Sequence, residues 1–309
     1  MGNATTATVS ALDDSTTYSF AVTAYNSDGQ VSFPSNQVTL NPARIANLST
    51  RVGVGKFGHV LISGFIIGGN DQKTVALRAV GPSLAQFGVA GAMADPVLKL
   101  YDASGALIAE NDNWRDSQQA TFAENGPFHA LQPSSDLESA IAITLPPGSY
   151  TAIVSGKDNT TGVALAELYD CSPDANAKLS NISARAFVGG DDNVLIGGVT
   201  IDGAGSASRS APLMLRAIGP SLAENGITDP LYDPTLAVYD SNGTLLAFND
   251  NWWSDGANEA GQITVSGFAP SNELESAIVV LLPAGNYTAI VRGSNGTTGV
   301  ALFDAYQLP

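Results

Sequence analysis

An internal repeat is the feature that most constrains how this chain can fold. LRAVGPSL at 77–84 returns as LRAIGPSL at 215–222, and LESAIAITLPPGSYTAIVSG at 137–156 returns as LESAIVVLLPAGNYTAIVRG at 274–293. Each copy spans about 130 residues, whereas the units of solenoid proteins run at roughly 20–50 residues. The repeat therefore predicts two tandem domains. We place them at residues 43–171 and 178–309, joined by a linker at 172–177 and preceded by a segment at 1–42.

Within each copy the hydrophobic pattern has the period of a β-strand. In VALRAV at 75–80 and YTAIVS at 150–155, successive residues alternate between two faces, and turn sequences such as PPG and SGKDN bound the second of these segments. Short alternating segments punctuated by Gly, Pro, Asp and Asn are typical of antiparallel strands. Helical turns are expected only in the inserts around 83–93 and 115–130. The sequence therefore predicts an all-β fold of tandem antiparallel β-sandwiches.

The segment that precedes the repeat has a strand pattern of its own. LDDSTTYSFAVTAYNSDG at 12–29 and SFPSNQVTL at 32–40 resemble the last three strands of a fibronectin type III domain, with Tyr18 at the tyrosine-corner position. About 40 residues stand where such a domain needs roughly 90–100. The resemblance therefore implies an incomplete fibronectin-type-III-like segment.

The same resemblance implies that this segment carries one apolar face. Tyr18, Phe20, Val22 and Ala24 would point inward in a complete domain. Three strands cannot bury such a face by themselves. Three outcomes are open. The segment docks on the first repeat, or strands of another subunit complete it and build an oligomer or filament, or it frays because it is a piece of a longer protein.

A second resemblance covers the later part of each copy. DPVLKLYDASGALIAENDNW at 95–114 and DPTLAVYDSNGTLLAFNDNW at 233–252 are each followed by a TAIV strand and by TTGVAL. These segments resemble the jelly-roll β-sandwich modules of the pre-peptidase C-terminal type, which are appended to secreted bacterial proteins. The resemblance implies a jelly-roll-like topology and an extracellular or bacterial cell-surface location.

Charge excludes several classes of partner. The chain has 13 Lys and Arg against 29 Asp and Glu, which gives a formal net charge of -16. A field of this sign repels phosphate backbones, so we expect no nucleic-acid partner. No apolar run approaches the roughly 18 residues of a membrane span, so we expect no membrane insertion.

The residues that could support catalysis do not follow the repeat. His59 aligns with Asn193, and His129 has no histidine counterpart in the second copy. Neither lies in the sequence context of a serine hydrolase or a zinc hydrolase. Cys171 is the only cysteine and stands beside the linker, which indicates a free thiol. We therefore predict that the protein is not an enzyme.

Two arginines sit inside otherwise apolar strands, Arg78 in VALRAVG and Arg216 in LMLRAIG. A half-buried guanidinium needs a carboxylate partner. The expected partners are Glu138 and Glu275, which open the repeated ESAI strands, with Asp95 and Asp233 as the other candidates. A structural ion pair is one interpretation, and binding of an acidic ligand is the other.

The NDNW sequence raises the question of a metal site. A hairpin centred on Ala103 and Ser104 would bring Asp95 close to Asp112, and the second copy would bring Asp233 close to Asp250. Two carboxylates beside an amide oxygen suit calcium, which prefers oxygen ligands. The competing interpretation is that these residues bond their own turn backbone. The candidate calcium ligands are Asp95, Asp112, Asn113, Asp233, Asp250 and Asn251.

Tryptophans close both NDNW sequences. Trp114, Trp252 and the adjacent Trp253 could form platforms on which a sugar ring stacks, with neighbouring Asp and Asn bonding its hydroxyls. Alternatively, each tryptophan plugs the end of its sandwich, because tryptophan is usually mostly buried.

Taken by itself, the sequence favours a non-enzymatic extracellular structural protein. It would be a cell-surface, matrix or filament component that self-assembles by strand complementation through residues 1–42. The alternative is a carbohydrate-binding or adhesion module of a larger secreted protein, stabilised by calcium, with a polysaccharide as partner.

Overall fold

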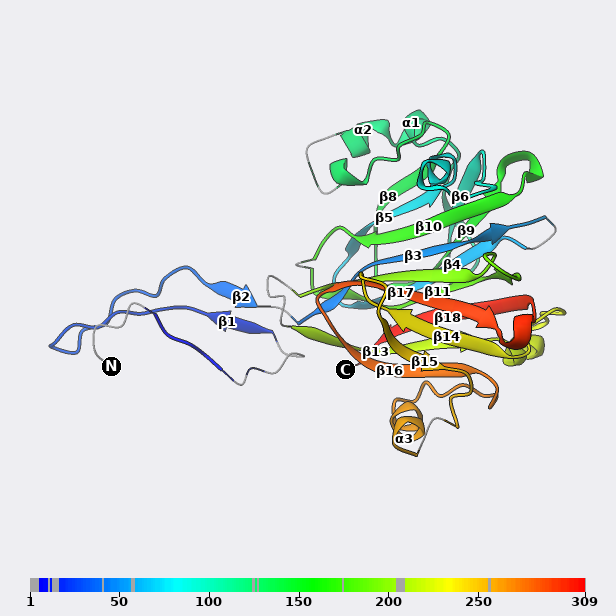
Figure 1. The fold of residues 1–309 in the computed structure, drawn as a ribbon. Helices are drawn as coiled ribbons and strands as arrows, with labels where there is room; N and C mark the ends of the chain where they lie inside the picture. The colour runs from blue at the N-terminus through cyan, green and yellow to red at the C-terminus, as the bar shows by residue number, and fades with distance from the viewer. Residues whose placement is uncertain are drawn as a thin grey trace.

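The structure is a computed structural model that describes residues 6–10, 12, 17–40, 42–56, 59–123, 126, 128–173, 175–203, 209–254 and 257–308. Within these ranges the chain forms two eight-stranded antiparallel sheets and a separate two-stranded ribbon. The all-β sandwich fold predicted from the sequence is confirmed (Figure 1).

Each copy of the repeat supplies eight strands. The first copy forms β3 (Arg44–Val54), β4 (Leu61–Gly69), β5 (Lys73–Val80), β6 (Pro96–Asp102), β7 (Leu107–Asn111), β8 (Ser139–Leu145), β9 (Gly148–Gly156) and β10 (Gly162–Asp170). The second copy forms β11 (Ala177–Val188), β12 (Leu195–Asp202), β13 (Ser210–Ile218), β14 (Pro234–Tyr239), β15 (Leu245–Asn249), β16 (Ser276–Pro283), β17 (Gly285–Gly293) and β18 (Gly299–Gln307).

The strand order within each copy is that of a jelly roll. The first, eighth, third and sixth strands of a copy lie side by side in one sheet, and the second, seventh, fourth and fifth lie in the other. This order agrees with the eight-stranded, double-Greek-key arrangement of jelly rolls. One full sheet runs β15-β14-β17-β12-β3-β10-β5-β8, and the other runs β16-β13-β18-β11-β4-β9-β6-β7.

The two copies share both sheets. Strand β3 pairs with β12, with Arg51 opposite Ile196, and β11 pairs with β4, with Arg185 opposite Ile62. Arg185 is the counterpart of Arg51 in the repeat, and Ile196 is the counterpart of Ile62. The two contacts between the copies are therefore related by an approximate two-fold axis. One cluster of buried apolar side chains runs through both copies. The copies therefore form one continuous sandwich, an arrangement that the repeat alone does not reveal.

Alternation along the strands builds this core. In β12, every second residue from Leu195 to Ile201 is buried, and the residues between them are only partly covered. Such a strand lies between a packed inner face and a partly solvated outer face. At β12 the outer face of the sheet is therefore left partly open to solvent.

Short helices fill the connections. The structure has η1 (Pro82–Phe87), α1 (Trp114–Ser117), α2 (Gln119–Ala123), η2 (His129–Leu131), η3 (Lys157–Asn159), η4 (Pro220–Asn225), α3 (Ala257–Val265) and η5 (Ser294–Gly296). Helices α1 and α2 lie at one end of the sandwich and α3 at the other (Figure 1). The longest helix in the described part of the chain has nine residues, too few to span a bilayer.

The N-terminal ribbon extends away from the sandwich (Figure 1). It consists of β1 (Tyr18–Phe20) and β2 (Val38–Leu40), which pair antiparallel, where three strands were expected. Val22 is 71% exposed and Ala24 is also exposed, so the first copy does not cover this part of the predicted apolar face. Tyr18 and Phe20 are half-buried and stack on each other.

Candidate functional site

The predicted acidic clusters form at the base of a hairpin in each copy. Asp95 precedes β6 and Asp112 follows β7, and these strands pair with Leu98 opposite Asn111. The pairing is shifted by two residues from the centred hairpin, because the turn is longer and β7 carries a bulge at Ile108, between Leu107 and Ala109. The two carboxylates still meet. Burial and the neighbouring charge of Asp112 raise the pKa of Asp95 above its ordinary value.

A lysine that the sequence did not single out completes the cluster in the first copy. The Nζ atom of Lys157, in η3, lies 2.6 Å from Asp112 Oδ2 and 3.6 Å from Asp95 Oδ2. Its hydrogen bond to Asp112 raises the pKa of Lys157. At the equivalent position the second copy has Ser294, which carries no charge. This difference between the copies was the sequence signal for the role of Lys157.

Oxygen atoms in both clusters lack hydrogen-bond donors. The Oδ1 atoms of Asp95, Asp112 and Asn113 are buried without a hydrogen-bond partner, and so are those of Asp233 and Asn251 in the second copy. Buried acceptors nearly always accept a hydrogen bond, because a buried acceptor without one destabilises the folded state by about 1–3 kcal/mol. No group of three or more His, Cys, Asp or Glu side chains that could hold a metal occurs among the described residues. Each cluster thus offers two carboxylates and one amide.

In these hairpins, the aspartates that bond the turn backbone are not those of the acidic clusters. Asp102 Oδ1 accepts hydrogen bonds from the backbone N–H groups of Ser104 and Ala106 at 2.8 Å and 3.0 Å. Asp240 does the same in the second copy, through Asn242 and Thr244. These bonds close the turn at the tip of each hairpin, far along the strands from the acidic cluster. The clusters at the base therefore need another explanation for their buried oxygens.

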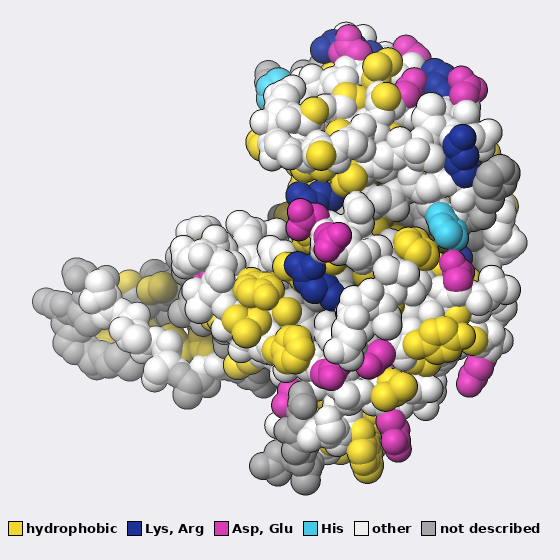
Figure 2. Space-filling model, turned by 45° about the vertical axis from the view of Figure 1, so that its right-hand side comes forward, with side chains coloured by type: hydrophobic (Ala, Val, Ile, Leu, Met, Phe, Trp, Pro, Cys, Tyr) yellow, Lys and Arg dark blue, Asp and Glu magenta, His cyan; other side chains and the backbone are white. Residues whose placement is uncertain are grey.

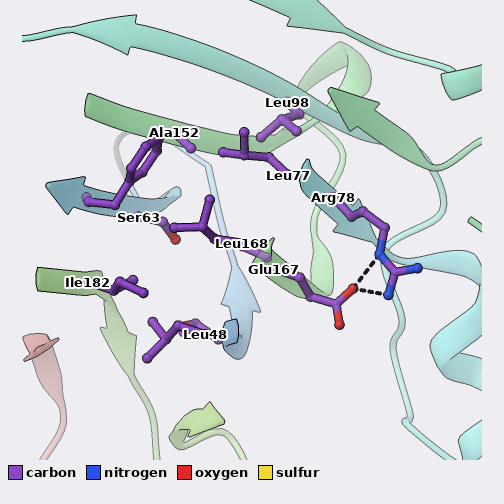
Figure 3. Close-up of a pocket in the computed structure, with 13 residues that line it drawn as sticks. Leu48, Ser63, Leu77, Arg78, Leu98, Ala152, Glu167, Leu168 and Ile182 are labelled. Atoms are coloured by element: carbon purple, nitrogen blue, oxygen red, sulfur yellow. Dashed lines mark hydrogen bonds and ion pairs between the residues drawn. The ribbon is translucent and has the colours of Figure 1, made fainter. Parts of the chain in front are cut away.

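The half-buried arginine of the first copy, Arg78, has a different partner from the one expected. Arg78 Nε donates to Glu167 Oε2 at 2.8 Å, while Nη1 bonds the Leu131 carbonyl and Nη2 lies 3.1 Å from the Tyr169 hydroxyl. Figure 3 shows this pair turned away from the apolar side chains of Leu77 and Leu168. Strand pairing explains the choice, because β10 places Glu167 directly opposite Arg78.

Arg216 of the second copy repeats this arrangement. Its Nε and Nη2 atoms bond the two oxygens of Asp304 at 2.9 Å and 2.6 Å, and β18 places Asp304 opposite Arg216. Glu138 and Glu275 were therefore wrong as ion-pair partners, and so were Asp95 and Asp233. The correct partners lie across a strand pair that joins distant parts of the chain.

Glu138 and Glu275 instead hold the turns after β5 and β13. Glu138 is fully buried, and its Oε1 accepts hydrogen bonds from Gly81 N, Ser83 N and Ser83 Oγ. Glu275 bonds Gly219 and Ser221 in the same way. Each carboxylate thus satisfies donors at the start of a 3₁₀ helix, a structural role.

Burial of the first two tryptophans corrects the sugar-platform interpretation. Trp114 is 1% exposed and Trp252 is 8% exposed, so neither offers a ring face to a sugar. Their Nε1 atoms bond the carbonyls of Ser135 and Asn272 at 3.1 Å and 3.0 Å. Both act as plugs beneath the helical inserts. Trp253 is 58% exposed and lies edge-on to Trp252.

The histidines and the cysteine lie apart from one another in ordinary structural contacts. His59 Nε2 is 3.2 Å from Asp229 Oδ2, and its ring stacks on Phe187 at a centroid distance of 4.9 Å. His129 Nδ1 is within hydrogen-bond distance of Gln132. Burial and the nearby Asp170 raise the pKa of Cys171 to about 11, which keeps the thiol protonated at neutral pH.

Comparison with known proteins assigns the chain to no family. No protein-family model and no curated protein matches the chain significantly. A DUF4785 family protein from Legionella pneumophila is similar at 8% identity and a TM-score of 0.26, with 93% of this chain and 64% of that chain covered. This chain thus spans less than two thirds of that protein's length.

Two further solved structures show weaker likeness. The STIV MCP matches at 9% identity and a TM-score of 0.23, covering 96% of this chain and 93% of its own. Vicilin from Corylus avellana (hazelnut) matches at 8% identity and a TM-score of 0.16, covering 83% of this chain and 76% of its own. At these TM-scores the likenesses carry no argument about function.

Proposed function

We propose that this protein is a non-enzymatic structural component of an extracellular or cell-surface assembly, in which successive copies join head to tail through the N-terminal ribbon. The observation that carries the proposal is the exposure of apolar side chains along the ribbon. Its exposed apolar residues are Val22 (71%), Tyr25 (61%), Val31 (65%), Phe33 (96%) and Val38 (60%). Soluble proteins rarely leave so many large apolar side chains together in water, and a two-stranded ribbon is marginally stable by itself.

The second copy offers an open sheet edge for such a ribbon. Strand β15 is the last strand of its sheet, and Leu245, Leu246 and Phe248 on it are 52%, 45% and 55% exposed. Figure 2 shows hydrophobic side chains on the surface of the lower part of the sandwich, which holds the second copy. Unprotected apolar edges are sites of strand addition.

The corresponding edge of the first copy is protected. Strand β7 has Glu110 at the position of Phe248, and Glu110 Oε1 lies 3.2 Å from Lys99 Nζ on β6. Charged side chains on an edge strand block pairing with another chain. Of these two equivalent edge strands, only β15 thus lacks a charged side chain, and it lies at the second-copy end of the sandwich. A ribbon that adds to this end makes a contact between two different surfaces, which propagates into a filament instead of closing as a dimer.

Light scattering and negative-stain microscopy test this proposal. The full chain should form oligomers or filaments that grow with concentration, and deletion of residues 1–42 should leave folded monomers. Phe248→Glu, which copies the residue of the first copy, should also abolish assembly. Ile108→Glu on β7 is the matched control and should assemble normally. Filaments that survive both changes, or a full chain that stays monomeric at high concentration, would overturn the proposal.

The same proposal includes a structural calcium ion at the acidic cluster of the second copy, held by Asp233, Asp250 and Asn251. Buried Oδ1 atoms of Asp233 and Asn251 without donors support it. In the first copy, Lys157 already supplies a positive charge beside the carboxylates. Its counterpart in the second copy, Ser294, is uncharged, so a bound cation could supply that charge there. Calcium bound here would tie the hairpin base to η5 and stiffen the end of the sandwich beside β15.

A further inference from the structure

A groove of about 650 Å³ lies on the outer face of the sheet where the two copies join. We name it the joint groove. Its volume lies in the range of roughly 300–1,000 Å³ that is usual for small-molecule sites. Its lining comes from five adjacent strands of both copies, β5, β10, β3, β12 and β17, and from η1 and the segments after η1 and before β8. The residues that matter here are Ser49, Arg51, Phe87, Ser134, Ile196 and Thr288.

Arg51 is the group in this groove with donors to spare. No ion pair or side-chain hydrogen bond of Arg51 occurs within the described ranges, and its strand neighbour Ile196 is apolar. The two acids that line the groove are both engaged, Glu167 with Arg78 and Glu138 with backbone N–H groups. A half-buried guanidinium beside apolar side chains favours a planar anion that it can bind through two parallel hydrogen bonds.

The equivalent place in the second copy is partly filled. There Phe187 stands where the first copy has Gly53, and it stacks on His59. The pocket beside Arg185, the counterpart of Arg51, has a volume of about 180 Å³. In the first copy, a Cβ atom on Gly53 would meet no atom within 4 Å, so the space beside Arg51 is open. Arg51 thus lies beside a large groove, whereas its counterpart Arg185 lies beside a small pocket.

The other groups of the joint groove suit a carbohydrate. Phe87 is 81% exposed and offers a ring face on which a sugar can stack, and the second copy has Asn225 at that position. Hydroxyl groups of Ser49, Ser134 and Thr288 can exchange hydrogen bonds with sugar hydroxyls. An apolar platform with a few placed polar groups is how such ligands are held.

We propose that the joint groove binds an oligosaccharide in which one sugar is a uronic acid, with its carboxylate on Arg51 and a neighbouring ring on Phe87. A single carboxylate fits best, because the net charge of -16 repels a densely charged polymer. The site does not depend on the proposed assembly, since neither Phe248 nor any described residue among 1–42 lines it.

Calorimetry on the full chain tests the site with a panel of disaccharides that contain glucuronate, galacturonate or mannuronate, each paired with its neutral counterpart. At least one acidic disaccharide should bind more tightly than its neutral partner. Arg51→Gln should weaken that binding about 10-fold or more, because a hydrogen bond to a charged group is lost. Arg185→Gln is the matched control and should leave the affinity unchanged.

A second variant guards against indirect effects. Gly53→Phe, which copies the second copy, should block binding while thermal melting shows an intact fold. The proposal fails if no acidic disaccharide binds at millimolar concentration, or if acidic and neutral members bind equally. It also fails if the two arginine variants weaken binding alike, or if a peptide with one carboxylate binds more tightly than every sugar. Filament formation by Arg51→Gln should be normal, which separates this result from the test of assembly.

Discussion

Exchanging Lys157 and Ser294 between the two copies is the most direct test of the acidic clusters. If Asp233, Asp250 and Asn251 hold calcium, the wild-type chain should bind one calcium ion. Ser294→Lys should bind none, because the ammonium takes the place of the cation as it does in the first copy. Lys157→Ser should bind two, because Asp95 and Asp112 are then left without their lysine.

The size of the thermal effect can be estimated. At a calcium concentration of about 100 times the Kd, binding to the folded state alone adds about 2.7 kcal/mol to the free energy of unfolding. An unfolding entropy of about 2.1 cal/mol/K per residue over the 309 residues of the chain means that this shifts the Tm by about 4 °C. Chelator should therefore lower the wild-type Tm by about 4 °C, and added calcium should restore it.

Scanning calorimetry with and without chelator measures the shift, and isothermal titration counts the ions. Ser294→Lys should show no response to calcium, and its Tm in chelator should be at least that of the wild type in chelator. Asp250→Asn should also lose the response, whereas Asp112→Asn in the first copy should keep it. A wild-type Tm that chelator leaves unchanged, or a Ser294→Lys variant that still binds calcium, would refute this reasoning.

The remaining predictions concern stability. Trp114→Ala should lower the free energy of unfolding by about 3–5 kcal/mol, because it empties a fully buried plug, whereas Trp253→Ala on the surface should change it by less than about 0.5 kcal/mol. Chemical denaturation of both variants measures the free energy of unfolding. An equal loss in the two variants would contradict the role of Trp114 as a buried plug. Hydrogen bonds from Ser104 and from the backbone of Ala106 hold the pKa of Asp102 below its ordinary value. A carboxyl group whose pKa is lowered by folding stabilises the folded state at pH values above its ordinary pKa of about 3.9. This stabilisation is lost as the pH falls through the pKa of the folded state. The Tm of Asp102→Ala should therefore lie below that of the wild type at pH 7, and this difference in Tm should shrink below about pH 4. A difference in Tm that does not change with pH would rule out the Asp102 carboxylate as its cause.

Much of the local architecture could be predicted from the sequence, because it depends on contacts between residues that are close along the chain. Strand alternation depends only on neighbouring residues, so the all-β sandwich followed from segments such as 75–80 and 150–155. A hairpin joins its two strands through a short turn, so Asp95 and Asp112 could be placed near each other even though the turn and the bulge moved the register.

The features that were missed or predicted wrongly all depend on contacts across the jelly roll. The partner of Arg78 is Glu167, which β10 brings back beside β5, and no spacing along the chain predicts which strand returns there. Lys157 reaches the acidic cluster through η3 after β9, although it lies far in sequence from Asp95 and Asp112. Trp114 follows a polar loop sequence typical of an exposed site, but its ring is covered by the helical insert that packs on β8.

The largest difference lies in how the two copies meet. Sequence determines that both copies consist of short alternating strands and share one fold, because the repeat and its alternation are written in the residues themselves. Pairing of β3 with β12 and of β4 with β11 was decided only by the tertiary structure. Each copy presents two strand edges whose N–H and C=O groups are equally able to pair with solvent, with another chain or with the other copy. Joining the copies satisfies these groups and merges the two cores into one, and the joint groove exists only because that pairing sets β12 and β17 of one copy beside Arg51 of the other.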